Sequence, residues 1–571
     1  MDNNRYLTID GIPVEINGEK NLLALIQKVG IKMPTFCYHS ELSTYGACRM
    51  CMVEDQWGTL HASCSTPPKP GMEIRTNTER LRKYRKVILE LLLANHCRDC
   101  TTCDNNEKCK LQDIARRFHI EGVRFPNAAS KPDVDDSSPC ITIDHHKCIL
   151  CGDCVRTCNE IQNVGVIDFM NRGSRMVVGT AFHKPIGETD CVGCGQCSAV
   201  CPTGAIVVKN NISDVWKALS DKDTMVTIQI APAVRVAIGR ELGLQDGQNT
   251  MGLIVAALRR MGFDEIYDTS TAADLTVMEE SAELLEHVTA GNELPLFSSC
   301  CPAWVRYVET KHPELMEHVS SCKSPMQMFA AVIREQFREE PKKHVHIALM
   351  PCTAKKREAL REEFRAADGT HMVDYVLTTQ EFVQMVKESG IQLTSIRPEA
   401  IDMPFGTMAG AGVIFGTTGG VTEAVLRRIS DNKRGDGIMY QPLRGLEGVK
   451  EVNIPYGDTT LHIGVVSGLG NTRKLLETLQ SGSVQYDFVE IMACPGGCAG
   501  GGGQPIHDGE ECAEARGNVL WRLDHKMPLR FSHENPDVQA LYKEYLGKPL
   551  SERSHHLLHT DIEAWQMPQE L

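Results

Sequence analysis

Short apolar runs predict strands along the whole chain, and the first of them lie close to the N-terminus. Residues 6–10 alternate apolar and polar side chains and end in the turn signal Asp10-Gly11. A second run at residues 14–16 predicts another strand, and residues 21–28 predict a short helix. Strands and a helix in this order are compatible with a small ferredoxin domain.

The pattern changes beyond about residue 211, where apolar strands end in loops and helical stretches follow. Examples are residues 225–230, residues 345–349 before a loop that holds Cys352, and residues 488–491 before Cys494. This alternation predicts an α/β domain, in which functional sites gather at the carboxyl ends of strands. The position of Cys352 and Cys494 at such ends favours a ligand role for both.

Composition bounds the class of protein. With 571 residues, of which 42% are hydrophobic and 23% charged, the chain is long enough for several domains and a large core. No run of ~20 apolar residues occurs, so no membrane span is expected. The N-terminus lacks the basic-then-apolar pattern of a secretory signal, and we therefore expect a cytoplasmic protein.

The net charge of −14 argues against nucleic-acid binding. One basic cluster is opposed only by Glu79. It is interpreted either as a solvated helix face or as a docking patch for an acidic electron carrier. Its members are Arg75, Arg80, Arg82, Lys83, Arg85 and Lys86.

The chain holds 24 cysteines, which crowd into residues 37–201 and return as a few separate residues in the back part. A secreted disulfide scaffold is normally much shorter, whereas clustered cysteines in a reducing compartment indicate metal sites. The distribution favours three cysteine-rich domains followed by one large domain, with boundaries at residues 1–80, 81–128, 129–210 and 211–571.

The first two cysteine sites are ambiguous by spacing alone. The first has the spacing C-x10-C-x2-C-x12-C and consists of Cys37, Cys48, Cys51 and Cys64. Four thiolates suit either a [2Fe–2S] cluster or a zinc ion. The second combines one imidazole with three thiolates, which suits zinc or a [4Fe–4S] cluster, and consists of His96, Cys100, Cys103 and Cys109.

A duplicated array gives the strongest signal in the front part. The spacing C-x2-C-x2-C-x3-C occurs twice and is that of bacterial two-cluster ferredoxins, where the fourth cysteine of each run ligates the other cluster. One [4Fe–4S] cluster is then held by Cys148, Cys151, Cys154 and Cys201, and the other by Cys191, Cys194, Cys197 and Cys158. Two matched runs also favour iron–sulfur clusters at the two ambiguous sites, and together the clusters would form an electron relay.

Three motifs in the back domain indicate where such a relay leads. They are residues 298–304 (SSCCPAW), residues 350–358 (MPCTAKKRE) and residues 490–498 (EIMACPGGC), the last running into a glycine-rich stretch at 500–503. Four of their cysteines can converge on one [4Fe–4S] cluster, and the glycines permit backbone close to a bulky inorganic ligand. The alternative is buried free cysteines beside a flexible turn. No Ser-His-Asp arrangement, phosphate loop or GxGxxG fingerprint competes for the role.

These three motifs are similar to the signatures of [FeFe]-hydrogenases, and the front modules resemble, in the same order, the accessory domains of the monomeric clostridial type. The resemblance runs from about residue 5 to residues 532–536. It implies a multidomain α+β and α/β protein. The expected parts are a β-grasp [2Fe–2S] domain, a small His/Cys3 [4Fe–4S] domain, a two-cluster ferredoxin-like domain and a large α/β catalytic domain.

The resemblance also implies a catalytic H-cluster. Its [4Fe–4S] part would be bound by Cys301, Cys352, Cys494 and Cys498, and Cys498 would bridge to a two-iron subsite with CO, cyanide and a dithiolate bridge. The cyanide ligands would be held by Lys355, Ala231-Pro232 and Ser324-Pro325, and Met350 and Met492 would line an apolar pocket beside the two irons. With one [2Fe–2S] and three [4Fe–4S] accessory clusters, 15 cysteines serve the relay.

A proton route is implied as well. Cys300 matches the proton-donating cysteine of the family, and the route continues through Glu280, Ser320 and Glu283. Glu280 and Glu283 are three residues apart and suit one helix face, although taken alone they would be interpreted as an exposed acidic helix. The family pattern has an arginine at the outer end, where this chain has His287. An imidazole relays protons near neutral pH, so the effect of this departure stays open.

Four functions are weighed on these observations. The first is reversible formation of H2 from protons, with ferredoxin or flavodoxin as carrier and dedicated maturation proteins as further partners. A sensory homologue is disfavoured because Cys300 is present, and a pure relay subunit does not need the Cys300-Cys301 pair. A subunit of an NAD(P)H-linked complex often carries an extra C-terminal cluster, whereas only Cys512 follows Cys498 here. The cysteines left without a role are Cys97, Cys140, Cys322 and Cys512.

Overall fold

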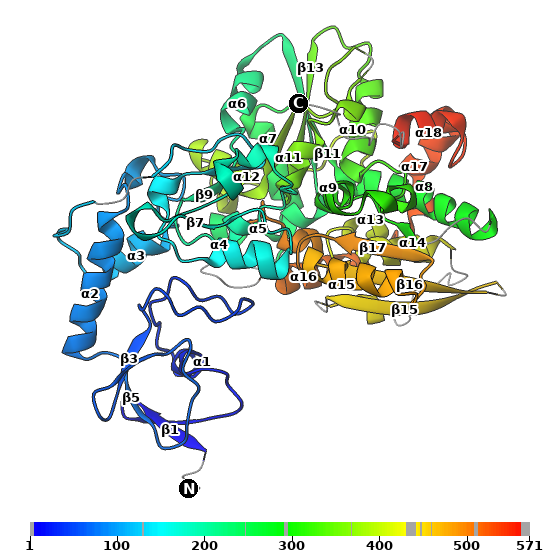
Figure 1. Ribbon diagram of the computed structural model, residues 1–571. Coiled ribbons are helices and arrows are strands. Elements are labelled where there is room, and N and C mark those ends of the chain that lie inside the picture. The colour runs from blue at the N-terminus through cyan, green and yellow to red at the C-terminus, as the bar shows by residue number, and fades with distance from the viewer. Residues whose placement is uncertain are drawn as a thin grey trace. The chain divides into compact units, whose positions relative to one another are not determined.

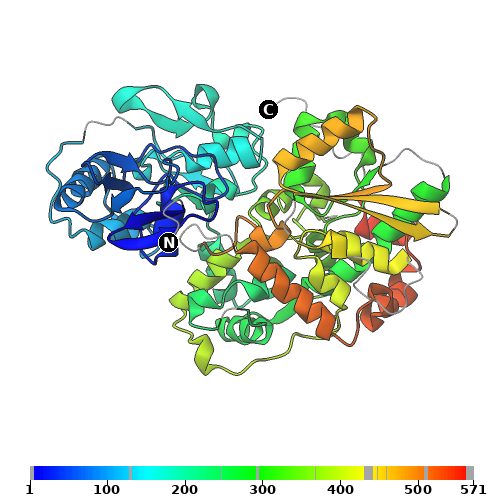
Figure 2. The same ribbon diagram turned by 90° about the horizontal axis from the view of Figure 1, so that it is seen from below.

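The structure is a computed structural model that describes residues 5–127, 131–245, 247–290, 295–366, 368–429, 441–445, 448–457, 459–506 and 512–560. It consists of two compact units, whose ribbons are drawn in Figures 1 and 2. The first unit contains Met1–Glu160, Gly165–Thr189 and Val200–Val207, and the second contains Ile161–Val164, Asp190–Ala199 and Val208–Leu571. The segment with Cys191, Cys194 and Cys197 therefore belongs to the second unit.

The first unit begins with the predicted strands and helix. Five strands form a sheet in the order β2-β1-β5-β3-β4, in which β1 (Tyr6–Ile9) pairs antiparallel with β2 (Ile12–Glu15) and parallel with β5 (Glu73–Arg75). The strands β3 (Met52–Asp55) and β4 (Leu60–Ala62) complete it. Helix α1 (Leu22–Lys28) packs its apolar side chains into the core of this sheet, and the side chain of Asn21 caps it by accepting a hydrogen bond from the Ala24 amide.

The basic cluster spans the end of strand β5 and the start of helix α2 (Glu79–Ala94), and it is not uniform. Arg85 is buried, and its guanidinium donates to the backbone carbonyls of Met50, Met52 and Thr76. Both interpretations of the cluster as a surface are therefore wrong for Arg85, which joins α2 to the sheet. The remaining five basic residues are exposed.

The rest of the first unit is built from short elements. Strands β6 (Ile141–Ile143) and β9 (Ile206–Val208) form one two-stranded sheet, and β7 (Asp168–Met170) and β8 (Val177–Gly179) form another. The helices here are α3 (Lys110–Arg117) and α4 (Asp153–Arg156). Because these elements are short, the loops that carry the cysteines are positioned mainly by contacts with one another and with the groups that the cysteines bind.

The second unit contains two four-stranded sheets. The first is fully parallel in the order β11-β10-β13-β14, and its apolar strands are buried on both faces. Its members are β10 (Thr224–Ile230), β11 (Glu265–Asp268), β13 (Lys343–Met350) and β14 (Tyr375–Thr378). The predicted strands at 225–230 and 345–349 thus form the centre of this sheet.

The second sheet is mixed and has the order β12-β17-β16-β15. Strands β12 (Leu296–Phe297), β17 (Phe488–Met492) and β16 (Thr459–Ser467) run parallel, while β15 (Val449–Tyr456) pairs antiparallel with β16 at the edge. Strands β15, β16 and β17 are the yellow and orange arrows in Figures 1 and 2. The predicted strand at 488–491 forms β17, and β16 lies directly beside it.

Helices surround both sheets, and helix α8 (Thr269–Ala290) is buried along most of its length. It packs against α10 (Pro325–Gln336), α13 (Gly410–Ile414), α14 (Gly420–Ile429) and α17 (Pro536–Leu541). The remaining helices are α5 (Gln196–Ala199), α6 (Ile212–Ser220), α7 (Met251–Met261), α9 (Pro302–Lys311), α11 (Ala354–Glu358), α12 (Thr379–Glu388), α15 (Leu469–Gln480), α16 (Ala513–Lys526) and α18 (Glu552–Leu558). In the part of the chain that the structure describes, no helix has the length and apolar character that a membrane crossing needs.

Candidate active site

The carboxyl ends of strands from both sheets of the second unit surround one cavity. Parallel strands direct the loops that follow them to the same edge, so residues distant in sequence meet there. Residues at or just after the ends of β10, β11, β12, β13 and β17 line the cavity. The lining residues that the sequence predicted are Ala231, Pro232, Cys300, Pro325, Met350, Cys352, Lys355, Met492 and Cys498. Its walls are mostly apolar, and the polar groups among these predicted residues are three thiols and one ammonium.

Four cysteines from three separate segments lie within electrostatic reach of one another. Burial raises the pKa of the Cys352 thiol well above its ordinary value, and Cys494, Cys498 and Cys301 raise it further. The Sγ of Cys301 also accepts a hydrogen bond of 3.4 Å from the Ala493 amide, which joins the first and third motifs. The structure therefore gathers the four thiols expected to bind one cluster.

Lys355 directs its ammonium into this site. Its Nζ lies 2.7 Å from the Glu358 carboxylate and donates a hydrogen bond of 3.2 Å to the carbonyl of Cys300. Burial opposes the charge of Lys355, but Glu358 outweighs burial and the pKa of the ammonium is raised. A permanent cation on an apolar cavity wall suits a small anionic ligand.

Ser324 lies outside the cavity lining, and the glycine-rich stretch packs against other backbone segments. Ser324 is absent from the cavity lining, and its hydroxyl instead caps helix α10 by accepting from the Gln327 amide at 3.5 Å. At Gly501 and Gly502 an added Cβ would meet the carbonyl oxygens of Pro351 at 2.3 Å and Cys194 at 2.4 Å. These glycines therefore allow protein backbones to approach each other closely.

The residues of the expected proton route occupy the buried side of helix α8, the loop that follows β12 and the segment between helices α9 and α10. The hydroxyl of Ser320 donates a hydrogen bond of 2.5 Å to Glu283. Neither carboxyl oxygen of Glu280 has a hydrogen-bond partner among the described residues. Burial raises the pKa of Glu280 well above its ordinary value, and Glu283 and Glu490 raise it further, which favours the protonated carboxyl. The alternative of an exposed acidic helix is wrong, because both glutamates are buried.

Cys300 lies between the cavity and this route. It lines the cavity, and burial raises the pKa of its thiol well above the ordinary value, with Glu280 as the next contribution. A protonated thiol beside a neutral carboxyl is an arrangement that can pass a proton. His287 lies on helix α8, and its buried Nδ1 has no hydrogen-bond partner among the described residues.

The segment that carries Cys194 packs against the catalytic loops. The hydroxyl of Thr353 donates a hydrogen bond of 2.6 Å to the Gly193 carbonyl, and the Gln196 amide donates one of 2.9 Å to the Gly500 carbonyl. Cys194 is also close enough to Cys494 to raise the pKa of that thiol, which burial already raises. The array with Cys194 is thus the part of the relay nearest to the catalytic cysteines within this unit.

In the first unit, the four cysteines of the first array form two pairs. The thiols of Cys37 and Cys48 are hydrogen-bonded, and so are those of Cys51 and Cys64. Within each pair the thiol hydrogen bond lowers the pKa of one member, Cys48 or Cys51, and raises that of the other, Cys37 or Cys64. Cys37 and Cys48 also lie within electrostatic reach of Cys64, so the four thiols are close enough together to bind one cluster.

The second array is brought together in part. Cys100, Cys103 and Cys109 lie within electrostatic reach of one another, and Cys97 is close to Cys100 as well. Burial, with the Lys131 ammonium as the next cause, lowers the pKa of His96 to about 4, which leaves its imidazole neutral. Its buried Nδ1 has no hydrogen-bond partner among the described residues. A neutral imidazole with an unpartnered nitrogen suits a metal ligand.

The duplicated array differs between its two halves. Cys148, Cys151, Cys154 and Cys201 line one small cavity in the first unit, which is the grouping expected from exchange of the fourth cysteines. Cys158 belongs to the first unit and its three expected partners to the second, so that set stays a prediction. Within the described residues, no three His, Cys, Asp or Glu side chains are arranged to hold a single metal ion. An iron–sulfur cluster is larger than one ion and spaces its ligands more widely.

Comparison with known protein families separates the front of the chain from its back. Residues 6–79 match a 2Fe-2S iron-sulfur cluster binding domain, residues 85–124 the iron-sulfur binding region of NADH-ubiquinone oxidoreductase-G, and residues 147–205 a 4Fe-4S dicluster domain. Residues 224–502 match the C-terminal domain of the iron-only hydrogenase large subunit. Residues 510–563 match the iron hydrogenase small subunit.

Whole-chain relatives decide the family. The chain is 33% identical to iron hydrogenase 1 of Clostridium pasteurianum, over 97% of this chain and 99% of that protein. It is 42% identical to the NADP-reducing hydrogenase subunit HndD of Solidesulfovibrio fructosivorans, over 97% of this chain and 98% of that protein. The chain belongs to the [FeFe]-hydrogenase family.

This hydrogenase is therefore an oxidoreductase that acts on hydrogen, with iron–sulfur domains ahead of its catalytic domain. The expected multidomain α/β organisation is confirmed at that level. Its structure is also similar to a variant of the apo [FeFe]-hydrogenase HydA1 from Chlamydomonas reinhardtii, with a TM-score of 0.54 and 40% identity over 62% of this chain and 98% of that one.

The catalytic cavity of the hydrogenase fits the H-cluster that the family implies. Four converging thiols suit a [4Fe–4S] cluster, and the adjoining apolar cavity holds the Lys355 cation on its wall. Sequence reasoning missed several other lining residues. Thr269 and Ala273 begin helix α8, and Phe415 and Gly416 follow the Gly- and Ala-rich run at 409–412. Small side chains allow a backbone to approach a cavity closely, so that run is the sequence signal that could have indicated these lining residues.

Proposed function

We propose that this hydrogenase interconverts protons and H2 reversibly, with ferredoxin or flavodoxin as the external electron carrier. The observation that carries the proposal is the single cavity in which Cys300 lies with Cys352, Cys498 and Lys355. A proton-bearing thiol, metal-binding thiols and a fixed cation meet there, and this combination suits proton reduction better than electron relay alone.

The cofactor is held by residues of three motifs in this proposal. Cys301, Cys352, Cys494 and Cys498 bind the [4Fe–4S] part, and Cys498 also bridges to the two-iron subsite. Lys355 and the backbone around Ala231 and Pro325 hold its anionic ligands, while Met350 and Met492 exclude water. Once bound, the cofactor supplies two-electron chemistry at iron that no side chain provides. Ser324 acts through its helix cap in this scheme.

Protons reach the cavity through Cys300 from Glu280, Ser320 and Glu283. The neutral carboxyl of Glu280 can donate to the Cys300 side and be reprotonated from the Ser320–Glu283 pair, which is joined by a hydrogen bond of 2.5 Å. Each step moves one proton between neighbouring polar groups and returns the donor to its starting state.

Electrons arrive through one [2Fe–2S] and three [4Fe–4S] clusters in this proposal. The domains are residues 1–80, 81–128, 129–210 and 211–571. In support, hydrogen bonds from Thr353 and Gln196 hold the Cys194 segment against the catalytic loops. Maturation proteins supply the two-iron subsite in this proposal. The proposed location of the protein is the cytoplasm.

A second candidate is favoured by one specific observation. The relative with 42% identity over nearly the whole chain is an NADP-reducing hydrogenase subunit. On this alternative, partner subunits connect the same relay to NADP.

Assays of the matured, purified chain distinguish the two. H2 evolution from reduced ferredoxin by the isolated chain supports the first candidate. Turnover that appears only when NADPH and co-purified subunits are added supports the second. Absence of metal-bound CO and cyanide bands from the infrared spectrum after maturation would reject both.

A further inference from the structure

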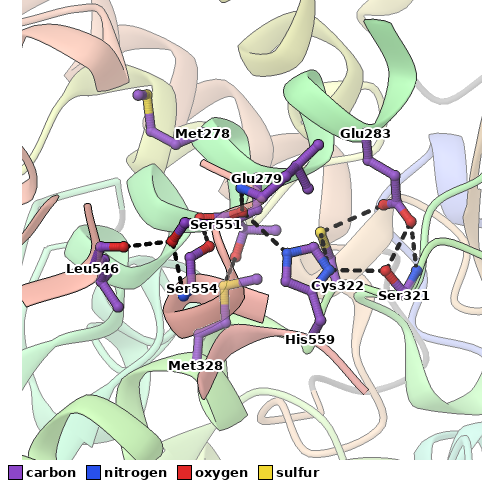
Figure 3. Close-up of polar contacts among 12 residues, drawn as sticks. Met278, Glu279, Glu283, Ser321, Cys322, Met328, Leu546, Ser551, Ser554 and His559 are labelled. Atoms are coloured by element: carbon purple, nitrogen blue, oxygen red, sulfur yellow. Dashed lines mark hydrogen bonds and ion pairs between the residues drawn. The ribbon is translucent and has the colours of Figure 1, made fainter. Parts of the chain in front are cut away.

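A buried hydrogen-bond network extends from the outer side of Glu283 to the C-terminal helices (Figure 3). The hydroxyl and the amide of Ser321 each donate a hydrogen bond of 2.9 Å to one oxygen of Glu283. The same hydroxyl lies 2.8 Å from Nδ1 of His559, whose Nε2 lies 3.0 Å from Glu279. This path is continuous and joins helix α8 to the residue that follows helix α18.

Glu279 is anchored as a carboxylate at the end of this path. It accepts hydrogen bonds from the hydroxyls of Tyr542 and Ser554 and from the amide of Leu550. Burial tends to raise the pKa of Glu279, but the bonds from His559, Ser554 and Tyr542 outweigh burial and lower it. An ionised carboxylate bonded to one ring nitrogen orients an imidazole and stabilises its protonated form.

The donors and acceptors of the network leave room for one mobile proton. When Ser321 donates to Glu283, its lone pairs accept from Nδ1–H of His559. The ring then donates to Glu279 through Nε2–H only if the imidazole is protonated. Transfer of the Nδ1 proton to Ser321, with the Ser321 proton moving on to Glu283, delivers one proton and leaves a neutral ring. Every heavy atom stays in place during this exchange.

His559 is buried, but its ring stacks on an exposed imidazole. The centroids of His555 and His559 are 4.6 Å apart and their planes differ by 5°. His555 lies on helix α18 and is exposed. The other titratable groups that face His559 are Glu279 and the thiol of Cys322, whose Sγ lies 4.0 Å from Nδ1. Two stacked rings do not readily carry positive charge together, so a proton that arrives on one favours release from the other.

The position expected for the exit, His287, shows no such connection. No hydrogen bond joins His287 to Glu283 in the described part of the chain, and its Nδ1 is buried without a partner. We propose that protons leave and enter the Glu283 end of the route through Ser321 and His559, with His555 as the exposed imidazole that exchanges with solvent. This proposal rests on the proposed function.

The test removes the proton-carrying groups one at a time in the matured full chain. His559→Gln keeps a polar side chain but no titratable ring, and Ser321→Ala removes only the hydroxyl. Both should lower H2 evolution on the order of 10- to 100-fold, since a positioned proton-transfer group typically contributes 10²- to 10⁴-fold. His555→Gln should cause a smaller loss that added imidazole buffer restores. His556→Gln, an exposed histidine of the same helix, is the matched control and should leave turnover unchanged.

Three further measurements distinguish the loss of a proton relay from a structural defect and from failure of the proposed function. The infrared CO and cyanide bands, the rate of accessory-cluster reduction and the melting temperature should match those of the wild type. Wild-type rates in His559→Gln and Ser321→Ala, with a loss in His287→Gln, would overturn the proposal and place the exit at His287. Losses that accompany altered infrared bands or melting would assign His559 a structural role instead. A matured wild type that forms no H2 would refute the proposed function itself.

Discussion

The hydroxyl of Thr353 donates a hydrogen bond of 2.6 Å to the carbonyl of Gly193. Thr353 directly follows Cys352, and Gly193 directly precedes Cys194. One hydrogen bond therefore connects a side chain beside a cysteine expected to bind the catalytic cluster with the backbone beside a cysteine expected to belong to the relay. Electron transfer becomes slower with distance, so contacts that hold these two segments together also set the rate at which the relay reaches the catalytic centre.

Gly502 tests this connection. A Cβ at this position would meet the Cys194 carbonyl oxygen at 2.4 Å and the backbone of Gly195 at 2.8 Å, so Gly502→Ala must push the two segments apart. We expect slower electron transfer from the reduced relay clusters into the catalytic centre, measured by rapid freeze-quench spectroscopy, and a several-fold loss of ferredoxin-dependent turnover.

The matched control for this substitution is Gly517→Ala. An added Cβ at Gly517, inside helix α16, meets its nearest neighbour at an ordinary contact distance of 3.5 Å. This variant should keep the wild-type rate, since alanine is favoured over glycine within a helix. Equal electron-transfer rates in Gly502→Ala and the wild type would show that the close approach at Gly502 is not needed for the relay.

Cys300→Ser tests the proton donor. Cys300 lines the cavity and is buried beside Glu280, so a serine of similar size keeps the packing but replaces the thiol with a far weaker acid. We expect nearly intact cluster spectra and a loss of turnover on the order of 10²-fold or more. H2 evolution that stays near the wild-type rate would remove Cys300 from the proton route.

Much of this architecture could be predicted from the sequence, because strands and cysteine arrays leave a recognisable pattern in nearby residues. The strands β10, β13 and β17 are buried on both faces and appear as apolar runs, and cysteine spacing reports directly on cluster geometry. The bond between His559 and Glu279 joins residues 280 positions apart and has no periodic or spacing signal. The burial of Arg85 has no local signal either, because its three carbonyl partners come from other segments of the chain.

Cys498→Ala tests the bridging position. Cys498 is the one cysteine predicted both to bind the [4Fe–4S] part and to reach the two-iron subsite, and it lies on the cavity wall. Its removal should abolish the infrared bands of metal-bound CO and cyanide. Cys494→Ala, which alters a cysteine absent from the cavity lining, should weaken the [4Fe–4S] signal first. Unchanged CO and cyanide bands in Cys498→Ala would reject the bridging assignment.

Two histidines of the central parallel sheet make stability depend on pH. Burial lowers the pKa of His344 to about 4, and burial, with Arg334 and His344 as further causes, lowers that of His346 well below its ordinary value. Both rings hydrogen-bond to the Thr227 hydroxyl. As pH falls below about 6.5, the unfolded chain gains protons at both positions while the folded chain stays neutral, so folding stability decreases. Each such proton contributes up to about 1.4 kcal/mol per pH unit.

The melting temperature of the apoprotein should therefore fall steadily between about pH 6.5 and pH 5. The double variant His344→Gln/His346→Gln should flatten this dependence, whatever its stability at pH 7, because the slope reports only on proton uptake. His462→Gln, on the exposed face of strand β16, is the matched control and should keep the wild-type slope. A slope unchanged in the double variant would show that acid sensitivity arises elsewhere, for example at buried carboxylates whose pKa is lowered, such as Glu279.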